Sequence, residues 1–144
     1  MNAVYVETSA VLRWLFGQER ADRVASFFEA VHRPLSSVLT ILEARRAIVR
    51  ASRERRIQRP RALQLERLLT HASETWTLLE ITEHIRFRAA RPFPVEPVRT
   101  LDAIHLSTSL EFAQVFPNLS VLSFDDRILD NLEPLGLVRA AAGV

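Results

Sequence analysis

The chain has 144 residues, of which 48% are apolar and 25% are charged, a length and composition that fit one folded domain and argue against extensive disorder. It contains no cysteine, and all 19 basic residues are arginine, which excludes disulfides, thiolate metal sites, lysine Schiff-base chemistry and the lysine of a phosphate-binding loop. No apolar run approaches the ~20 residues of a membrane span, and residues 1–6 do not resemble a signal peptide, so we expect a cytoplasmic protein that does not enter membranes.

Short apolar strands alternate with helices along the whole chain. We predict strands at 3–6, 34–36, 75–81, 118–123 and 137–139, and helices at 8–16, 20–31, 38–53, 60–73, 82–91, 101–115 and 125–132. The expected N-caps are Thr8 or Ser9, Ser37, Thr82 and Thr100. This alternation predicts an α/β fold of three layers, α/β/α, in which helices cover both faces of a short, mostly parallel sheet. We expect residues 1–144 to form a single domain of this kind.

Positive charge is concentrated in one part of the chain. The formal net charge is only +2, but residues 45–67 hold nine arginines against two glutamates, a local charge of +7 that leaves −5 for the remainder. An arginine-rich helical segment is typical of a solvated helix face. It is also the kind of segment that contacts nucleic-acid phosphates.

Four carboxylates occupy positions that suit a shared site. Glu7 follows the first predicted strand and Asp125 follows the strand at 118–123, so both lie at the carboxyl edge of the sheet, where ligands of parallel sheets bind. Glu43 and Asp102 lie on helices with almost no polar face, where a carboxylate is costly unless it is paired or binds a cation. Oxygen ligands without cysteine or a histidine pair favour Mg²⁺, or alternatively Mn²⁺.

Each acid also has a purely structural interpretation. Glu7 can be a helix cap or a member of an ion pair, and Asp125 can be a helix cap. Glu43 can pair with Arg46 on the next helix turn, and Asp102 can interact with the helix dipole alone. The convergence of all four acids at one sheet edge favours the metal site over these separate roles.

Two neighbours of these acids are weaker candidates for the site. Asp126 follows Asp125 and is either a further metal ligand or a solvated residue of a first helix turn. His105 lies one turn past Asp102, and we expect it to be a structural hydrogen-bond partner rather than a ligand.

Four stretches resemble the motifs of the PIN-domain family, in the family's order and over the whole chain. They surround the four acids and comprise residues 4–12, 36–47, 99–107 and 121–129. The third stretch is similar to the family's most recognisable motif. Within the family, the chain looks closest to the VapC toxins of bacterial type II toxin–antitoxin pairs.

The resemblance implies a Mg²⁺-dependent endoribonuclease that hydrolyses RNA with a metal-activated water and acts as the toxin of a toxin–antitoxin pair. The expected catalytic residues and metal ligands are Glu7, Glu43, Asp102 and Asp125, with Asp126 as a weaker fifth ligand. The candidates for contacting RNA or orienting ligands are Arg45, Arg46, Arg13, Thr8, Ser9 and Ser123. The expected partners are a cognate antitoxin, an RNA substrate and a second copy of the chain in a homodimer.

Two positions depart from the family's pattern. Ser123 stands where threonine is usual and retains the hydroxyl, whereas Glu7 stands where the family has aspartate. The extra methylene moves the carboxylate by roughly 1.5 Å, and an error of ~1 Å can cost on the order of 10²-fold in rate. The alternative function is therefore a PIN domain with weakened catalysis that acts as a binding module for antitoxin or RNA.

Overall fold

The computed structural model describes residues 3–30 and 33–140. Its five strands are β1 (Val4–Val6), β2 (Pro34–Ser37), β3 (Thr77–Leu79), β4 (Ser120–Leu122) and β5 (Val138–Arg139). They form one sheet in the order β3-β2-β1-β4-β5, and every pair of neighbours is parallel. The first strand therefore lies at the centre of the sheet, and its carboxyl end is flanked by the ends of β2 and β4.

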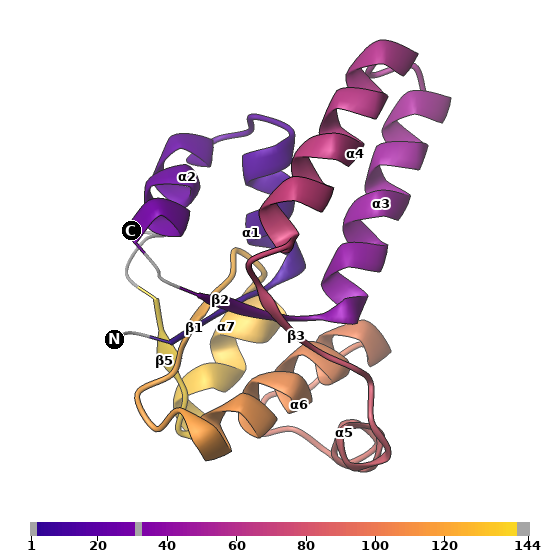
Figure 1. Ribbon diagram of the computed structural model, residues 1–144. Coiled ribbons are helices and arrows are strands. Elements are labelled where there is room, and N and C mark those ends of the chain that lie inside the picture. Colours follow the sequence, from indigo (N-terminus) through magenta and orange to yellow (C-terminus); the bar gives the residue numbers. More distant parts are fainter. Residues whose placement is uncertain (1–2, 31–32, 141–144) are drawn as a thin grey trace.

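Helices cover both faces of this sheet (Figure 1). One layer consists of α1 (Thr8–Leu15), α2 (Ala21–Ala30), α3 (Val38–Arg53) and α4 (Arg59–Ser73). The other consists of α5 (Glu83–Ala89), α6 (Thr100–Val115) and α7 (Asp126–Leu132), and a short 3-10 turn (Glu133–Leu135) leads into β5. The predicted three-layer α/β/α fold is confirmed.

Alternate residues of β1 face opposite sides of the sheet and divide the core in two. Val4 and Val6 pack with residues of α1, α2, α3 and α4, whereas Tyr5 packs with residues of α6 and α7. All three side chains are at most 2% exposed. Because both faces of the strand are buried, its sequence is a continuous apolar run rather than an alternation of apolar and polar residues.

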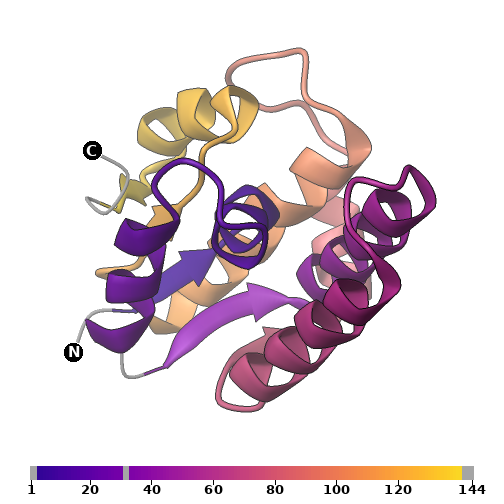
Figure 2. The ribbon, with the colours of Figure 1, turned by 90° about the horizontal axis from the view of Figure 1, so that it is seen from above.

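The arginine-rich segment forms a helical hairpin of α3 and α4, which lie side by side and project beyond the sheet (Figures 1 and 2). Their exposed faces carry most of the nine arginines of residues 45–67. The hairpin joins the sheet through its first helix, because α3 begins directly after the carboxyl end of β2.

Most predicted element ends agree with the structure, and Ser37 and Thr82 are confirmed as N-caps. The helix predicted at 20–31 is α2, and residue 31 lies outside the described part of the chain. The strand predicted at 75–81 is shorter, since only Thr77–Leu79 pair with β2. Among the described residues, no helix is long and apolar enough to cross a lipid bilayer.

The prediction that Thr8 or Ser9 caps α1 is wrong. The N-cap is Glu7, whose carboxylate accepts the backbone N–H of Ser9 at 2.6 Å. Glu7 takes this position because its side chain reaches the first orphan N–H groups of the helix, while the hydroxyls of Thr8 and Ser9 bond to other parts of the chain.

The start of α6 also differs from the prediction by one residue. Thr100 is the first residue of the helix and Arg99 is its N-cap residue. The carboxylate of Asp102 accepts the backbone N–H of Arg99 at 3.2 Å, so an acid inside the helix satisfies the donor at its start. This places Asp102 in the first turn with its side chain turned back toward Arg99.

Candidate active site

All four acids predicted from the sequence line one cavity of about 600 Å³. Glu7 follows β1 directly and Asp125 follows β4, and these strands are parallel neighbours whose ends lie together. Glu43 is on the second turn of α3, which follows β2, and Asp102 is on the first turn of α6. The cavity therefore lies at the carboxyl edge of the sheet, as expected for a parallel α/β fold.

Glu7 is 3% exposed, and its carboxylate is held by two uncharged donors. Oε2 accepts the backbone N–H of Ser9 at 2.6 Å, and Oε1 accepts the hydroxyl of Ser123 at 3.1 Å. Burial is the strongest influence on this group and raises the pKa of Glu7, although the charge of His105 and the hydrogen bonds from Ser9 oppose it. Both oxygens of Glu7 therefore already have a protein partner.

Glu43 belongs to a buried hydrogen-bond network and not to an ion pair with Arg46. Its Oε1 accepts the hydroxyl of Thr8 at 2.6 Å and lies 2.6 Å from Nε2 of His105. The other ring nitrogen, Nδ1, lies 2.7 Å from the hydroxyl of Tyr5. Because a carboxylate can only accept, Nε2 donates to Glu43. The expectation that His105 is a structural hydrogen-bond partner agrees with this geometry.

This network keeps Glu43 ionised. Burial alone would raise its pKa, but the hydrogen bonds from His105 and Thr8, together with the charges of His105 and Arg99, outweigh burial and lower the pKa of Glu43 below its usual value. Glu7 and Glu43 therefore shift in opposite directions within one cavity. The difference arises because the side chain of Glu43 is less buried than that of Glu7 and because Glu43 accepts hydrogen bonds from His105 and Thr8, with Arg99 as an additional positive charge.

Asp102 and Asp125 share a single guanidinium. Nε of Arg99 lies 3.1 Å from Oδ2 of Asp102, and Nη2 lies 3.5 Å from Oδ2 of Asp125. The other oxygen of Asp125 accepts the backbone N–H of Arg127 at 2.9 Å and caps α7. Asp125 is thus both a helix cap and a lining residue of the cavity, so its structural role does not exclude a functional one.

Ser9 and Ser123 form hydrogen bonds that stabilise the turn between β4 and α7. The hydroxyl of Ser9 accepts the N–H of Phe124 at 2.8 Å, and that of Ser123 accepts the N–H of Asp125 at 3.1 Å. Ser9 lines the cavity together with Thr8. These three hydroxyls therefore position carboxylates and backbone at the site.

The three arginines predicted to contact substrate do not line the acid cavity. The guanidinium of Arg13 stacks over the ring of Phe124, 4.3 Å from its centroid. Arg45 lies 3.7 Å from the carboxylate of Glu66 on α4, and Arg46 is exposed on α3. Arg45 and Arg46 are thus part of the surface of the α3–α4 hairpin.

Two other arginines line the cavity, Arg50 and Arg99, and neither was among the predicted site residues. Arg50 follows Glu43 by seven residues, which is two helix turns and the same helix face. Arg99 precedes Asp102 by three residues at a helix start. Both spacings are visible in the sequence, but Arg46 is also three residues from Glu43 and does not line the cavity, so spacing alone does not identify these arginines.

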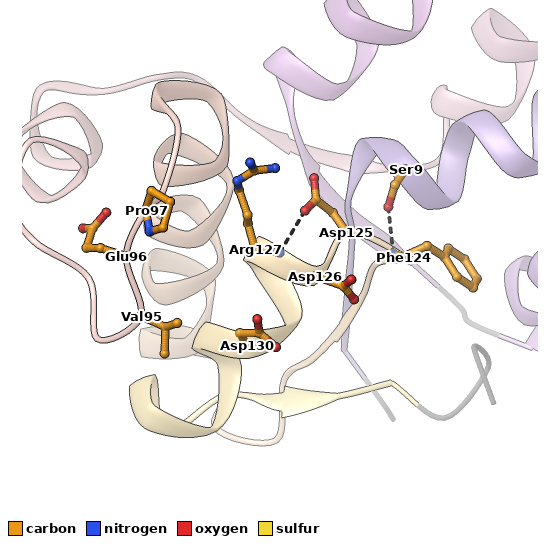
Figure 3. A pocket seen from close by; sticks show the side chains of 9 residues that line it. All are labelled: Ser9, Val95, Glu96, Pro97, Phe124, Asp125, Asp126, Arg127 and Asp130. Atoms are coloured by element: carbon orange, nitrogen blue, oxygen red, sulfur yellow. Dashed lines mark hydrogen bonds between the residues drawn. The ribbon is translucent and has the colours of Figure 1, made fainter.

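Asp126 lies outside the acid cavity. It is the exposed first residue of α7 and lines a neighbouring pocket of about 570 Å³ with Asp125, Asp130 and Glu96. Figure 3 shows the carboxylates of Asp125 and Asp126 on different sides of the turn that starts α7. The structure therefore does not place Asp126 in the cavity that the four acids share.

The donor set of the acid cavity suits a hard divalent cation. Its ligand atoms are carboxylate and hydroxyl oxygens, the type that Mg²⁺ and Mn²⁺ prefer. Within residues 3–30 and 33–140, however, no three His, Asp or Glu side chains are arranged so as to hold a metal ion. Each acid is instead engaged by a protein donor, as described above. The residues fit such an ion chemically.

Comparisons with known proteins agree with this geometry. A family model described as PIN domain matches residues 4–133. Ribonuclease VapC35 of Mycobacterium tuberculosis is 32% identical over 143 residues, which cover 97% of each chain. Ribonuclease VapC46 of the same organism is 28% identical over 137 residues, which cover 95% of each chain.

Two solved structures share the fold. A toxin–antitoxin complex from Klebsiella pneumoniae matches with a TM-score of 0.63 and 20% identity, covering 94% of this chain and 95% of that one. The structure of VapBC2 from Rickettsia felis, bound to a fragment of promoter DNA, matches with a TM-score of 0.66 and 8% identity. The match covers 96% of this chain and 97% of that one. With the family model matching most of its length and a relative at 32% identity, the chain belongs to the PIN-domain family.

Proposed function

We propose that this protein is a divalent-metal-dependent endoribonuclease and the toxin of a toxin–antitoxin pair. The observation that carries the proposal is the convergence of four carboxylates on one cavity at the carboxyl edge of the sheet. The names of the curated relatives support ribonuclease activity. The toxin–antitoxin complexes that share the fold support an antitoxin partner, and the homodimer stays a prediction.

Glu7, Glu43, Asp102 and Asp125 would hold the ion, with Mg²⁺ as the first choice and Mn²⁺ as the alternative. Phosphodiester hydrolysis needs an activated water and stabilisation of the charge that develops on the phosphate and the leaving oxygen, and a bound divalent ion supplies both. The buried donors around Glu7 and Glu43 fix the orientation of these two carboxylates before substrate arrives.

The remaining residues of the site bind and orient the RNA backbone. Four acids repel a phosphate, and Arg50 at the cavity wall offsets part of this repulsion. The α3–α4 hairpin adds a surface charge of +7 over residues 45–67, and its exposed arginines form bidentate contacts with phosphates. Arg45 and Arg46 follow Glu43 on α3. An RNA backbone bound by these two arginines would therefore run toward the acid cavity.

Position 7 favours a second candidate function, in which the domain binds antitoxin or RNA without efficient cleavage. Both oxygens of Glu7 are engaged by Ser9 and Ser123, and the side chain is longer than the aspartate of the family pattern. A carboxylate that stays in this position contributes little to an ion in the cavity.

RNA cleavage by the purified chain tests the proposal, with Mg²⁺, with Mn²⁺ and with EDTA. We expect metal-dependent cleavage that Asp102→Asn reduces by on the order of 10²-fold or more, since it removes a ligand charge at the reacting centre. The matched control is Asp130→Asn, because Asp130 is an exposed aspartate of α7 outside the acid cavity. Cleavage that persists in EDTA or in Asp102→Asn contradicts the proposal, and binding of RNA without cleavage favours the second function.

A further inference from the structure

Arg99 occupies the acid cavity in a way that resembles a bound cation. Its guanidinium contacts Asp102 at 3.1 Å and Asp125 at 3.5 Å, two acids that come from different elements and meet only at the site. In the described part of the chain, no other arginine or histidine side chain forms an ion pair with either carboxylate. One side chain therefore offsets part of the negative charge on the α6–α7 side of the cavity.

The two carboxylates need such a cation in the absence of metal. The side chain of Asp102 is only 8% exposed and that of Asp125 is 23% exposed, so water alone solvates them poorly and their charges repel each other. A guanidinium suits this position because its planar fork presents several N–H donors to more than one carboxylate oxygen.

Arg99 is also free to leave. Its side chain is 64% exposed, and within residues 3–30 and 33–140 its guanidinium forms hydrogen bonds or ion pairs with these two acids alone. If the side chain swings out, Oδ2 of Asp102 still accepts the backbone N–H of Arg99 at 3.2 Å, so the start of α6 keeps its hydrogen bond. The guanidinium is thus held by charge and not by packing.

We propose that Arg99 is a built-in counter-cation that competes with the divalent metal ion for Asp102 and Asp125, and that metal binding displaces its guanidinium from both. This inference rests on the proposed function, because it takes the acid cavity as the metal site. It makes Arg99 a positioning residue that sets the affinity of the site.

The test is the affinity of the full chain for Mn²⁺ alone, measured by calorimetry at fixed pH and ionic strength without RNA. Arg99→Gln removes the competing charge and is expected to bind Mn²⁺ roughly fivefold to tenfold more tightly than the unmodified chain. Arg99→Lys keeps the positive charge but loses the planar guanidinium, and its affinity for Mn²⁺ should lie between those of the unmodified chain and Arg99→Gln. The matched control is Arg139→Gln, which removes the charge of an exposed arginine on β5 that lies outside the acid cavity, and it should change the affinity by less than about twofold.

A second readout guards against a variant that folds poorly. Without metal, Arg99→Gln should unfold at a lower temperature than the unmodified chain because Asp102 and Asp125 repel each other. With saturating Mn²⁺, its melting temperature should rise by more than that of the unmodified chain. Both shifts follow from competition, whereas a purely structural role of Arg99 predicts only the first.

The possible results separate the inference from the proposed function. If the unmodified chain and Arg99→Gln bind Mn²⁺ equally well, and Asp102→Asn weakens both, the metal site stands and the inference is overturned. Weaker binding by Arg99→Gln overturns it as well. If no variant binds Mn²⁺, or if Asp102→Asn leaves binding unchanged, the proposed metal site fails and the inference fails with it.

Discussion

The two sides of the acid cavity hold their carboxylates by different means. On the side of β1 and α3, Glu7 and Glu43 are bonded by hydroxyls, a backbone N–H and the buried ring of His105. On the side of α6 and α7, Asp102 and Asp125 share the exposed guanidinium of Arg99. The first side is therefore fixed by the packing of the core, whereas the second can exchange one cation for another without disturbing the fold.

The largest expected effect comes from breaking the fixed side at His105. This ring is 3% exposed and joins Tyr5, Thr8 and Glu43. His105→Ala leaves a cavity and removes the hydrogen-bond partner of buried polar groups. We therefore expect a loss of about 3 kcal/mol in the free energy of unfolding. Urea denaturation at neutral pH measures it.

Two controls sharpen this prediction. Tyr5→Phe removes the hydroxyl that bonds to Nδ1 but keeps the ring, and should cost about 1 kcal/mol. His84→Ala removes a histidine whose side chain is 76% exposed and should change stability by less than about 0.5 kcal/mol. A His105→Ala variant that is as stable as His84→Ala would show that the network does not fix this side of the cavity.

Much of the fold and the acid set can be predicted from the sequence, because both depend on local patterns. The apolar run of β1 identifies a central strand, and the placement of Glu7 and Asp125 after strands puts them at one edge. The partners of the acids depend on packing between distant segments and are not visible locally. His105 is 62 residues from Glu43 and 100 from Tyr5, and no spacing rule connects them.

The arginines show a similar limit of sequence-based prediction. Charge density predicted a basic surface over residues 45–67, and the α3–α4 hairpin carries it. Charge density does not say which arginines face the acids, because that depends on the helix face and on the neighbouring element. Arg45 turns to Glu66 of α4, while Arg50 of the same helix lines the cavity.

A shorter side chain at position 7 tests whether the carboxylate of Glu7 is held in a position that supports RNA cleavage. Glu7→Asp restores the family residue, and the shift of roughly 1.5 Å should raise the rate of metal-dependent RNA cleavage by on the order of 10²-fold. The matched control is Glu43→Asp, the same shortening at a position where the family pattern has glutamate, which should lower the rate. If Glu7→Asp cleaves no faster than the unmodified chain, Glu7 is not what limits catalysis.

The smallest expected effect distinguishes Glu7 from Glu43 within the fixed side, by their opposite pKa shifts. Burial raises the pKa of Glu7 above its ordinary value of 4.5 in the folded protein, so the folded state binds the proton more tightly than the unfolded state. Ionisation of Glu7 therefore destabilises the fold as pH rises from 4.5 through the raised pKa. In EDTA at neutral pH, Glu7→Gln should be more stable than the unmodified chain, and this gain should disappear near pH 4.

Glu43→Gln is the control of opposite sign. The pKa of Glu43 lies below 4.5 in the folded protein, so its ionised form contributes stability above pH 4.5 that is lost as pH falls through the lowered pKa. Glu43→Gln should therefore be less stable than the unmodified chain at neutral pH, with a difference that shrinks in acid. Denaturant unfolding of both variants at the two pH values measures the pair. A loss of stability in Glu7→Gln at neutral pH would mean that the hydrogen bonds from Ser9 and Ser123 outweigh burial, and that Glu7 is held as firmly in its ionised form as Glu43.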